Sequence, residues 1–542
     1  MSAEEKKFET LSGIPLKSMY TAEDIRHLDP ERDLGRPGGP PFTRGPYPEM
    51  YRKRPWRIFQ LSGYGAPEDE RERILYLIRH GETGIIMEPD QLTSYHMFDP
   101  DHSDVVERRE DVGLTGAPLV SLRDYETIFE GIPMETIYTH PGGGCIQFAP
   151  FAHACYFSLA LRRGLSLGQI RGTGQSDYFL SYLSCPLKDQ IPPQAGLRLN
   201  CDFIEYCIEN VPEWVPVSIP GYNASESGIN AYQEIALVLA NAIAYIDEVL
   251  RRGRLKIDDF AHTIGGVNFA CGRDFFEEIA KIRAARRMWH KLLSERYGCR
   301  NEQALRMRIH GLTTGSWMTN RQPYNNIVRG TLMGLSAALG GVQSLGVSGF
   351  DEAISVPSEL AHLLSVRTQQ ILQVETNITS VTDPLGGSYF IEWLTDELEK
   401  RGWEYLKKIE EAGGFIKALN SGWMHREAAK GMMERETKLN SGEWKWVGAN
   451  CFEMEEEPTR VRAFRSDTTV WDKAMANLLA LRNSRDKAGV REALEELREA
   501  CRDETKNIMP PMIKAVQAYV TIGEVGEVFR QVFSVWNPPL PL

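Results

Sequence analysis

The stretch "TIGGVNFACGRDFFEEIAKIRAARRMWHKLLSERYGCRNEQALRMRIHGLT", residues 263 to 313, contains the repeating unit of the fold. Its first eight and its last eight residues are β-rich runs. Between them, residues 274 to 298 place apolar side chains at intervals of three and four residues, which is typical of an amphipathic helix. A helix between two short strands predicts a βαβ unit, in which the two strands pair in parallel.

Further β-rich runs recur along the chain at intervals of roughly 35 to 50 residues, with helical patterns between them. They are GIIME (84–88), METIYTH (134–140), PVSIPGY (216–222) and GVQSLGVSG (341–349). This alternation predicts an α/β fold with a parallel sheet, either doubly wound or closed into a (β/α)8 barrel.

Polar and glycine-rich residues directly follow the expected strands. They are Glu88, HPGGG (140–144), GTGQSD (172–177), Asn223, HGLTTG (310–315) and DPLGG (383–387). An open sheet binds ligands at one or two crevices, whereas a barrel carries a loop after every strand on one functional face. The distribution therefore favours a (β/α)8 TIM barrel. GTG at 172–174 lacks the third glycine of a dinucleotide-binding fingerprint.

Composition divides the chain into three parts. Residues 1–55 are rich in Pro, Gly and charge, which predicts an extended N-terminal arm, and residues 56–395 hold the predicted barrel. Amphipathic helical patterns at 471–504 and 512–533 predict a helical C-terminal region over 396–542.

Charge and cysteine content exclude several classes of protein. A net charge of −12 argues against general nucleic-acid binding. The nine cysteines are scattered and never form CxxC, so neither a disulfide framework nor a metal site is expected. No apolar run approaches the roughly 20 residues that span a bilayer, and the charged N-terminus lacks a secretory signal. We expect no membrane association and a cytoplasmic location.

Eight ordered blocks carry a resemblance to a known family. They are RGPYPEMYRKRPW (44–56), LSGYG (61–65), GTGQSD (172–177), PGYNASESG (220–228), AKIRAARRMW (280–289), QSLGVSGFDEA (343–353), DPLGGSYFIE (383–392) and LRNSRDKAGVREAL (481–494). In this order and spacing the chain resembles the large, acyl-CoA-binding subunit of coenzyme B12-dependent acyl-CoA mutases, the methylmalonyl-CoA mutase family. The resemblance implies a barrel that holds coenzyme A along its axis, with adenosylcobalamin at the C-terminal face of the strands.

The basic segment at 43–60 gains a role from this resemblance. Tyr47, Met50 and Arg54 match residues that hold the nucleotide end of coenzyme A. Arginine binds phosphate in a bidentate manner, and an aromatic ring with a thioether suits an adenine base. The alternative is a solvated basic arm that is only latched to the barrel.

The family's cobalamin-binding domain carries DxHxxG, and none of the eleven histidines lies in that context. The resemblance therefore implies a separate small cobalamin-binding subunit as a partner, and a G-protein chaperone as a further one. Glu352 and Ala353 match residues at the upper face of the cofactor, and His310 matches a histidine placed with them. The alternative for Glu352 is a carboxylate at a helix N-terminus.

The acyl pocket departs from methylmalonyl-CoA mutases. Their substrate-contacting tyrosine is Leu61 here, and their carboxylate-binding arginine falls at Cys185 or Pro186. The hydroxyacyl branch, which acts on 2-hydroxyisobutyryl-CoA, has an aliphatic residue at the first of these places and an aspartate that matches Glu88. A pocket with one carboxylate and no arginine predicts a hydroxyacyl or branched acyl group. Glu88 could instead pair with a nearby arginine.

Three more residues match the family's catalytic positions. Asn223 replaces a histidine that binds the thioester carbonyl, while Gln175 and Tyr222 are retained. For Gln175 the alternative is a hydrogen bond that closes its own loop. The expected activity is a radical 1,2-rearrangement of an acyl-CoA carbon skeleton. The alternatives are methylmalonyl-CoA mutase proper and an acyl-CoA-binding subunit that has lost the rearrangement.

Overall fold

The computed structural model describes residues 8–184, 187–455, 461–465 and 467–539 of the 542-residue chain. Within these residues nine parallel strands form one sheet in the order β1-β9-β8-β7-β6-β5-β4-β3-β2. The strands are β1 (Arg57–Ile58), β2 (Leu61–Ser62), β3 (Gly84–Met87), β4 (Tyr138–His140), β5 (Arg171–Gln175), β6 (Trp214–Pro220), β7 (Gly266–Cys271), β8 (Arg308–Thr313) and β9 (Ser344–Gly346).

The first and last members of this order are two ends of one short segment, and this closes the sheet. Arg57 pairs with Ser344 of β9, whereas Leu61 pairs with Ile86 of β3. Residues 57–62 therefore act as one strand that reaches both edges. Counted in this way the sheet is an eight-stranded parallel barrel, and the predicted (β/α)8 fold is confirmed.

Each of the six predicted β-rich runs overlaps a strand, namely β3, β4, β6, β7, β8 or β9. Two placements were wrong. GTGQ at 172–175 lies in β5 rather than in a loop, because Gly172 lets the Trp214 ring pack against the strand. DPLGG follows the turn at Ile378–Ser380, not a strand, and its Asp383 forms ion pairs with Arg44 and Arg283.

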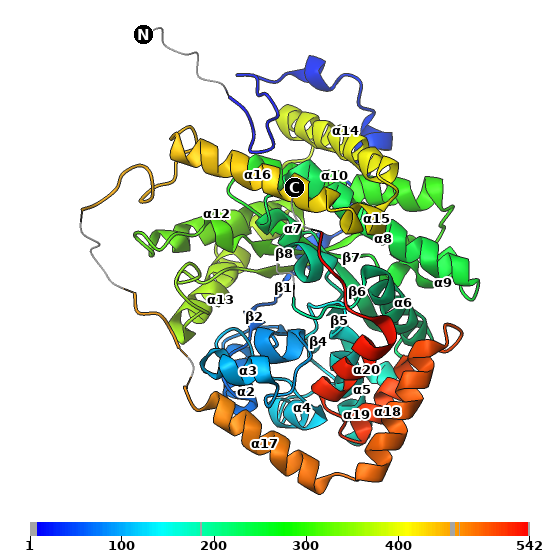
Figure 1. Cartoon of the computed structure of the whole chain (residues 1–542). Helices are drawn as coiled ribbons and strands as arrows, with labels where there is room; N and C mark the ends of the chain where they lie inside the picture. The colour runs from blue at the N-terminus through cyan, green and yellow to red at the C-terminus, as the bar shows by residue number, and fades with distance from the viewer. Residues whose placement is uncertain (1–7, 185–186, 456–460, 466, 540–542) are drawn as a thin grey trace.

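Helices follow the strands and cover the outside of the barrel (Figure 1). The main helix of each βα unit is α2 (Pro67–Arg79), α4 (Leu122–Ile128), α5 (Ala149–Arg162), α6 (Pro193–Asn210), α8 (Ala231–Arg252), α10 (Phe275–Lys291), α12 (Asn325–Gly340) or α13 (Glu359–Val374). Shorter helices are α1 (Met50–Lys53), α3 (Ser103–Glu107), α7 (Tyr222–Glu226), α9 (Ile257–Phe260) and α11 (Glu302–Leu305). Single 3₁₀ or π turns lie at Ala22–Ile25, Pro30–Leu34, Gln91–Tyr95, Arg109–Asp111, Leu167–Gln169, Leu180–Ser184, Ala261–Thr263, Leu292–Arg296, Gly315–Trp317 and Ile378–Ser380.

The longest barrel helix shows how the sequence sets helix ends. Asn230 caps α8, because its side chain accepts a hydrogen bond from Gln233 N. Gly253 ends the helix in the left-handed region, at φ 71°, where a side chain would be strained. Among the described helices, none is long and apolar enough to cross a membrane.

The N-terminal arm is held against the barrel by a buried arginine of α10. Arg286 is 1% exposed, and it donates from Nε to Phe42 O at 3.0 Å and from Nη2 to Thr43 O at 3.2 Å. Its Nη2 also donates to Gly340 O at the end of α12, at 2.6 Å. The basic run of α10 thus joins the arm to the barrel wall.

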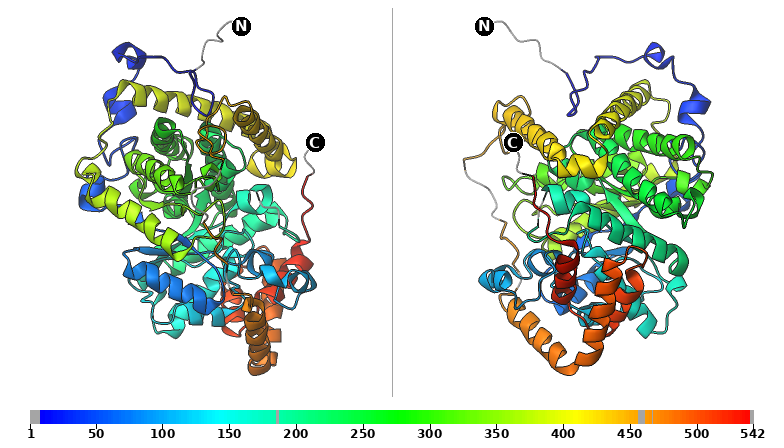
Figure 2. Two further views of the ribbon diagram at one scale, coloured as in Figure 1. Left: turned by 90° about the vertical axis from the view of Figure 1, so that its left-hand side faces the viewer. Right: turned by 45° about the vertical axis from the view of Figure 1, so that its right-hand side comes forward.

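Helices beyond the barrel lie in two groups at opposite ends of the molecule (Figures 1 and 2). The yellow group, which includes a helix that packs on α8 and α10, is α14 (Tyr389–Glu411), α15 (Phe415–Asn420) and α16 (Trp423–Asn440). The orange and red group, which packs on the β3–α6 side, is α17 (Val470–Ser484), α18 (Lys487–Arg502), α19 (Met509–Gln517) and α20 (Ile522–Phe533). The expected boundary between residues 395 and 396 lies inside α14.

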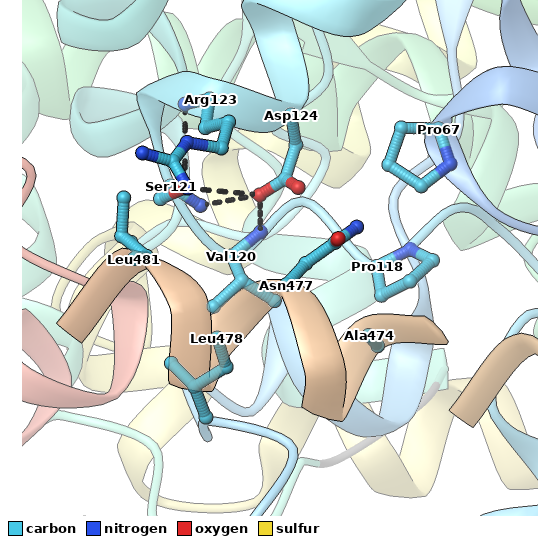
Figure 3. Close-up of a pocket in the computed structure, with 10 residues that line it drawn as sticks. All are labelled: Pro67, Pro118, Val120, Ser121, Arg123, Asp124, Ala474, Asn477, Leu478 and Leu481. Carbon is cyan, nitrogen blue, oxygen red and sulfur yellow. Dashed lines mark hydrogen bonds between the residues drawn. The ribbon is translucent and has the colours of Figure 1, made fainter. Parts of the chain in front are cut away.

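Figure 3 shows how closely α17 packs on the loop before α4. Leu478 and Leu481 face Val120, and the space left between the two elements is about 10 Å³. That volume admits roughly one water molecule. This contact is therefore part of the core rather than a ligand site.

Candidate functional site

A cavity of about 360 Å³ lies at the carboxyl ends of the barrel strands. Four residues that the sequence singled out line it, namely Leu61, Glu88, Tyr222 and Glu352. They come from four places far apart in the chain, and the parallel sheet brings them together because all its strands end at one edge.

Glu88 directly follows β3, and its Oε1 accepts a hydrogen bond from the Tyr95 hydroxyl at 2.9 Å. Burial raises the pKa of Glu88 to about 7, against the effect of the Tyr95 hydrogen bond, and the charge of Asp177 adds to the rise. Among the described residues no arginine forms an ion pair with Glu88. The alternative of a structural ion pair therefore finds no support.

Gln175 and Asn223 both donate to the same buried carboxylate. The Nε2 of Gln175 lies 3.1 Å from Asp177 Oδ2, and Asn223 Nδ2 is hydrogen-bonded to the same oxygen. Gln175 Oε1 also accepts from Asn268 Nδ2 at 3.4 Å. The alternative for Gln175 is thus realised in part, since it bonds to the loop that directly follows it and also to Asn268 of β7.

Glu352 and Ala353 lie in a turn after β9, at the rim of the cavity. Ala353 is exposed, whereas burial raises the pKa of Glu352 to about 7, with Glu226 adding to the rise. The next helix, α13, begins at Glu359, so Glu352 is not at a helix N-terminus. Its carboxylate makes no hydrogen bond or ion pair with any described residue.

His310 lies deeper than the predicted cofactor face. It is the third residue of β8, where its Nδ1 lies 2.9 Å from Ser344 Oγ and its ring contacts Phe59 edge-on. It does not line the cavity, although Leu312 two residues on does. The structure therefore does not bring His310 together with Glu352 and Ala353, because β8 continues for three more residues, to Thr313, before it reaches the edge.

The inside of the barrel is polar. Val267 and Ile309 turn outward into the main core, so the alternate residues Asn268 and His310 face the axis. Within the described residues, three buried ring nitrogens here have no hydrogen-bond partner: both of His140 and Nε2 of His310. Burial lowers the pKa of His140 to about 3 and that of His310 to about 4, so both imidazoles are neutral. Such unpaired groups call for a polar occupant of the axis.

The opposite end of the barrel carries the basic arm. Tyr47 is 40% exposed and Arg54 is exposed, whereas Met50 is buried against Gly45 and Gly341. Burial lowers the pKa of Arg57, and Arg54 adds to this, so the two guanidinium groups are near each other. Met50 thus packs within the arm, and Tyr47 and Arg54 remain accessible.

The cations of α1 and its C-cap do not contribute to the latch. Arg52, Lys53 and Arg54 are exposed, and none forms an ion pair with a described residue. The latch uses Arg44 and backbone groups of residues 42–43 instead. The arm therefore combines a latched part with a free basic end.

Two predicted positions have no structural outcome. Cys185 and Pro186, which match the family's carboxylate-binding arginine, lie outside the described residues.

Arg73 of α2 lines the cavity, and the sequence analysis missed it. Its side chain is 4% exposed, and Nη1 donates to Pro357 O at 3.0 Å and lies 2.9 Å from His362 Nδ1. The guanidinium lies 4.6 Å from the centre of the Tyr64 ring. The expectation of a pocket without arginine was wrong. In the sequence nothing distinguishes Arg73 from Arg71 in the same helix, and only packing turns it inward.

Comparison with known proteins agrees with this architecture. The family model described as methylmalonyl-CoA mutase matches residues 9–535. The chain is 37% identical to the 2-hydroxyisobutanoyl-CoA mutase large subunit of Aquincola tertiaricarbonis, over 98% of this chain and 93% of that one. It is 34% identical to a methylmalonyl-CoA mutase of Cereibacter sphaeroides, over 97% of this chain and 72% of that one. It is 32% identical to the mitochondrial methylmalonyl-CoA mutase of Homo sapiens, over 97% of this chain and 68% of that one.

Proposed function

The chain belongs to the methylmalonyl-CoA mutase family, and from that premise we propose that it is the large subunit of an adenosylcobalamin-dependent acyl-CoA mutase acting on a hydroxyacyl- or branched acyl-CoA. One observation carries the proposal. The cavity at the strand ends combines the aliphatic Leu61 with the carboxyl of Glu88, and a polar axis runs from it toward the basic arm.

Coenzyme A suits this path through the barrel. Its phosphates would meet the free cations at 52–54, and Tyr47 offers an exposed ring to the base. The neutral ring of His140 offers a donor and an acceptor to amide groups on the axis, and His310 offers its unpaired Nε2. Residues 57–62 span about 20 Å along the barrel, so the nucleotide end and the acyl end would be well separated.

The acyl group would lie between Leu61, Glu88 and Tyr222. An ionised Glu88 accepts a hydrogen bond from a hydroxyl and repels a second carboxylate. Asn223 and Gln175 each keep one N–H that is not used by Asp177, and these can donate to the thioester carbonyl. With a substrate bound, Tyr222 and Leu61 would limit the access of water to the reacting carbons.

The rim fits a cofactor that approaches from outside the barrel. Ala353 presents a small exposed side chain next to Glu352. The Glu352 carboxylate lines the cavity and has no hydrogen-bond or ion-pair partner among the described residues, so it can accept a hydrogen bond from a bound group. When bound, adenosylcobalamin supplies the radical that starts the rearrangement. The part of this chain would be to hold the acyl group still and dry beneath it.

A small cobalamin-binding partner is part of the proposal. No DxHxxG occurs in the 542 residues, and the relative in Aquincola tertiaricarbonis is itself named a large subunit. A G-protein chaperone stays a prediction that rests on the family resemblance alone.

We expect the chain on its own to bind an acyl-CoA but to bind adenosylcobalamin only weakly, since the partner would hold the cofactor. Titration calorimetry of the purified chain with each ligand measures both. Cobalamin-dependent turnover should appear once a small DxHxxG subunit is added. Tight stoichiometric binding of adenosylcobalamin to the chain alone would contradict the proposed division of labour. Acyl-CoA binding without turnover in the full mixture would favour the alternative of a binding subunit.

Changing Arg54 to alanine should weaken acyl-CoA binding by about 1.5 to 3 kcal/mol, because a charge-assisted contact with phosphate is lost. The fold should be unaffected, since the Arg54 side chain forms no hydrogen bond or ion pair with a described residue. Arg502, an exposed arginine at the end of α18, provides the matched control, and Arg502→Ala should bind normally. Equal dissociation constants for the unmodified protein, Arg54→Ala and Arg502→Ala would favour the alternative, in which the arm is solvated and only latched to the barrel.

A second candidate, methylmalonyl-CoA mutase activity, is favoured by Arg73. This buried cation lines the cavity, and burial raises the pKa of Glu70, the nearby carboxyl, to about 8. Near neutral pH Arg73 therefore lacks a fully ionised partner among the described residues. A carboxylate on the acyl group could supply one. The substrate comparison in the Discussion distinguishes the two candidates.

A further inference from the structure

A buried carboxylate beside the cavity has no role in the scheme above. Asp177 follows β5 and is 0% exposed. Its backbone N–H donates to Gly144 O at 3.0 Å, which fixes the loop after β5 to the loop after β4. Burial raises the pKa of Asp177 to about 7, against the hydrogen bonds it accepts.

The two carboxylate oxygens of Asp177 accept hydrogen bonds from different parts of the chain. Oδ1 accepts from Leu180 N at 2.8 Å, which is a local turn contact. Oδ2 accepts from the side-chain amides of Gln175 and Asn223. These amides come from β5 and α7 and are 48 positions apart in sequence, so Oδ2 bridges two barrel units.

An amide side chain can present either its oxygen or its N–H₂ to a ligand, and a carboxylate removes that freedom. When Asp177 is ionised its Oδ2 is an acceptor only, so each amide then turns its nitrogen toward Asp177. The second N–H of the same nitrogen then points away from Asp177. Asn223 therefore presents an N–H, not its amide oxygen, at the position that a histidine holds in methylmalonyl-CoA mutases.

We propose that Asp177 is a positioning residue that fixes Gln175 and Asn223 as hydrogen-bond donors to the thioester carbonyl. This rests on the proposed function, since it assumes that an acyl-CoA thioester occupies the cavity. Without Asp177 the Asn223 amide can rotate and present its oxygen to the carbonyl oxygen, which is repulsive. Gln175 would keep only the 3.4 Å hydrogen bond from Asn268 Nδ2 to orient its amide. Other ionisable groups that face Asp177 are Glu88, Tyr95 and Tyr245.

The first test is Asp177→Asn in the full chain, assayed with the small subunit and adenosylcobalamin. We expect kcat to fall by about 100-fold, the loss typical of a misplaced reacting group, while KM changes little. Asp124→Asn is the matched control. Asp124 is also buried, and its pKa is also raised to about 7 by burial. It accepts hydrogen bonds from Val120 N and Ser121 N in the loop before α4 (Figure 3), and none of these residues lines the cavity. It should lose stability and keep kcat.

The second test needs no turnover. An acyl-CoA labelled with ¹³C at the thioester carbonyl is bound to the chain, and its C=O stretching frequency is measured by difference infrared spectroscopy. Two N–H donors should lower the frequency in the unmodified protein and in Asp124→Asn, and the shift should be absent in Asp177→Asn. If no acyl-CoA is turned over by the unmodified enzyme, the proposed function fails while this readout still tests Asp177.

A swapped variant, Asp177→Asn with Asn223→Asp, separates positioning from stability. It keeps a hydrogen bond between the two sites but presents a carboxylate, not an N–H, to the thioester. We expect thermal stability to recover relative to Asp177→Asn and turnover to stay low. Recovery of both, or an unshifted carbonyl frequency in the unmodified complex, would overturn the proposal. If Asp177→Asn does not fold, the swapped variant alone decides between these outcomes.

Discussion

Replacing Arg283 with methionine is expected to lower the free energy of unfolding by about 3 to 5 kcal/mol, because it leaves buried carboxylates without their partner. Arg283 is 1% exposed, and it bonds to Asp383 and Glu392, each at 2.5 Å. Burial alone would raise the pKa of Asp383, yet Arg283 and Arg44 hold it below its usual value. After the change Asp383 keeps Arg44, but Glu392, which is 0% exposed, has only Gly387 N at 2.9 Å.

Denaturant unfolding followed by circular dichroism measures this loss. Arg296→Met is the matched control in the turn that follows α10, because Arg296 pairs with Glu410 at the surface, where both side chains are more than 40% exposed. Exposed pairs contribute about 0 to 1 kcal/mol, so the control should unfold almost as the parent does. A loss below 1 kcal/mol for Arg283→Met would show that the buried network is not what joins α10 to α14.

Glu88→Gln is expected to lower kcat/KM for a hydroxyacyl-CoA by about 1 to 3 kcal/mol of transition-state stabilisation and to change little for the unsubstituted analogue. The carboxylate is an acceptor only, whereas glutamine can also present a donor to the hydroxyl oxygen. The unmodified protein should prefer hydroxyacyl- or branched acyl-CoA over methylmalonyl-CoA. The measurement compares all these substrates in both proteins, with the small subunit and adenosylcobalamin present.

The same pair of proteins should differ in pH dependence. Since burial raises the pKa of Glu88 to about 7, its acceptor form grows as the pH rises through 7. We expect kcat/KM for the hydroxylated substrate to rise over this interval in the unmodified protein and to rise less in Glu88→Gln. Asp177 and Glu352 titrate in the same range, so the difference between the two profiles is the diagnostic quantity.

Two outcomes would reject the assignment of Glu88. Equal losses on hydroxylated and unsubstituted substrates would make Glu88 a structural group that holds Tyr95. Efficient turnover of methylmalonyl-CoA that is lost in Arg73→Met would move the assignment to the second candidate, since Arg73 would then bind the free carboxylate.

Four residues that sequence reasoning singled out line one cavity, and they share a simple property. Leu61 lies in β2, which helps to close the barrel, and the other three come after strands: Glu88 after β3, Tyr222 after β6 and Glu352 after β9. Parallel strands must end at the same edge of the sheet. Their convergence follows from chain order and the period of the fold. The strands were readable for the same reason, because the six predicted runs carry enough apolar β-rich residues to be recognised.

The elements that were missed depend on neighbours far away in the sequence. In β5 the residues RGTGQ have little strand propensity, but a Cβ at Gly172 would lie 2.4 Å from the Trp214 ring, so the strand needs glycine there. Residues 57–62 form a strand only because their first two residues pair with β9 and their last two pair with β3.

By itself the sequence determined the family, the barrel and the edge at which the polar residues gather, because strand order and side-chain alternation are properties of the local chain. Tertiary structure alone decided which way individual side chains turn. It placed Arg73 in the cavity wall, His310 below the rim and Asp177 between two amides. Burial and partner choice depend on packing between distant elements, and no local pattern encodes them.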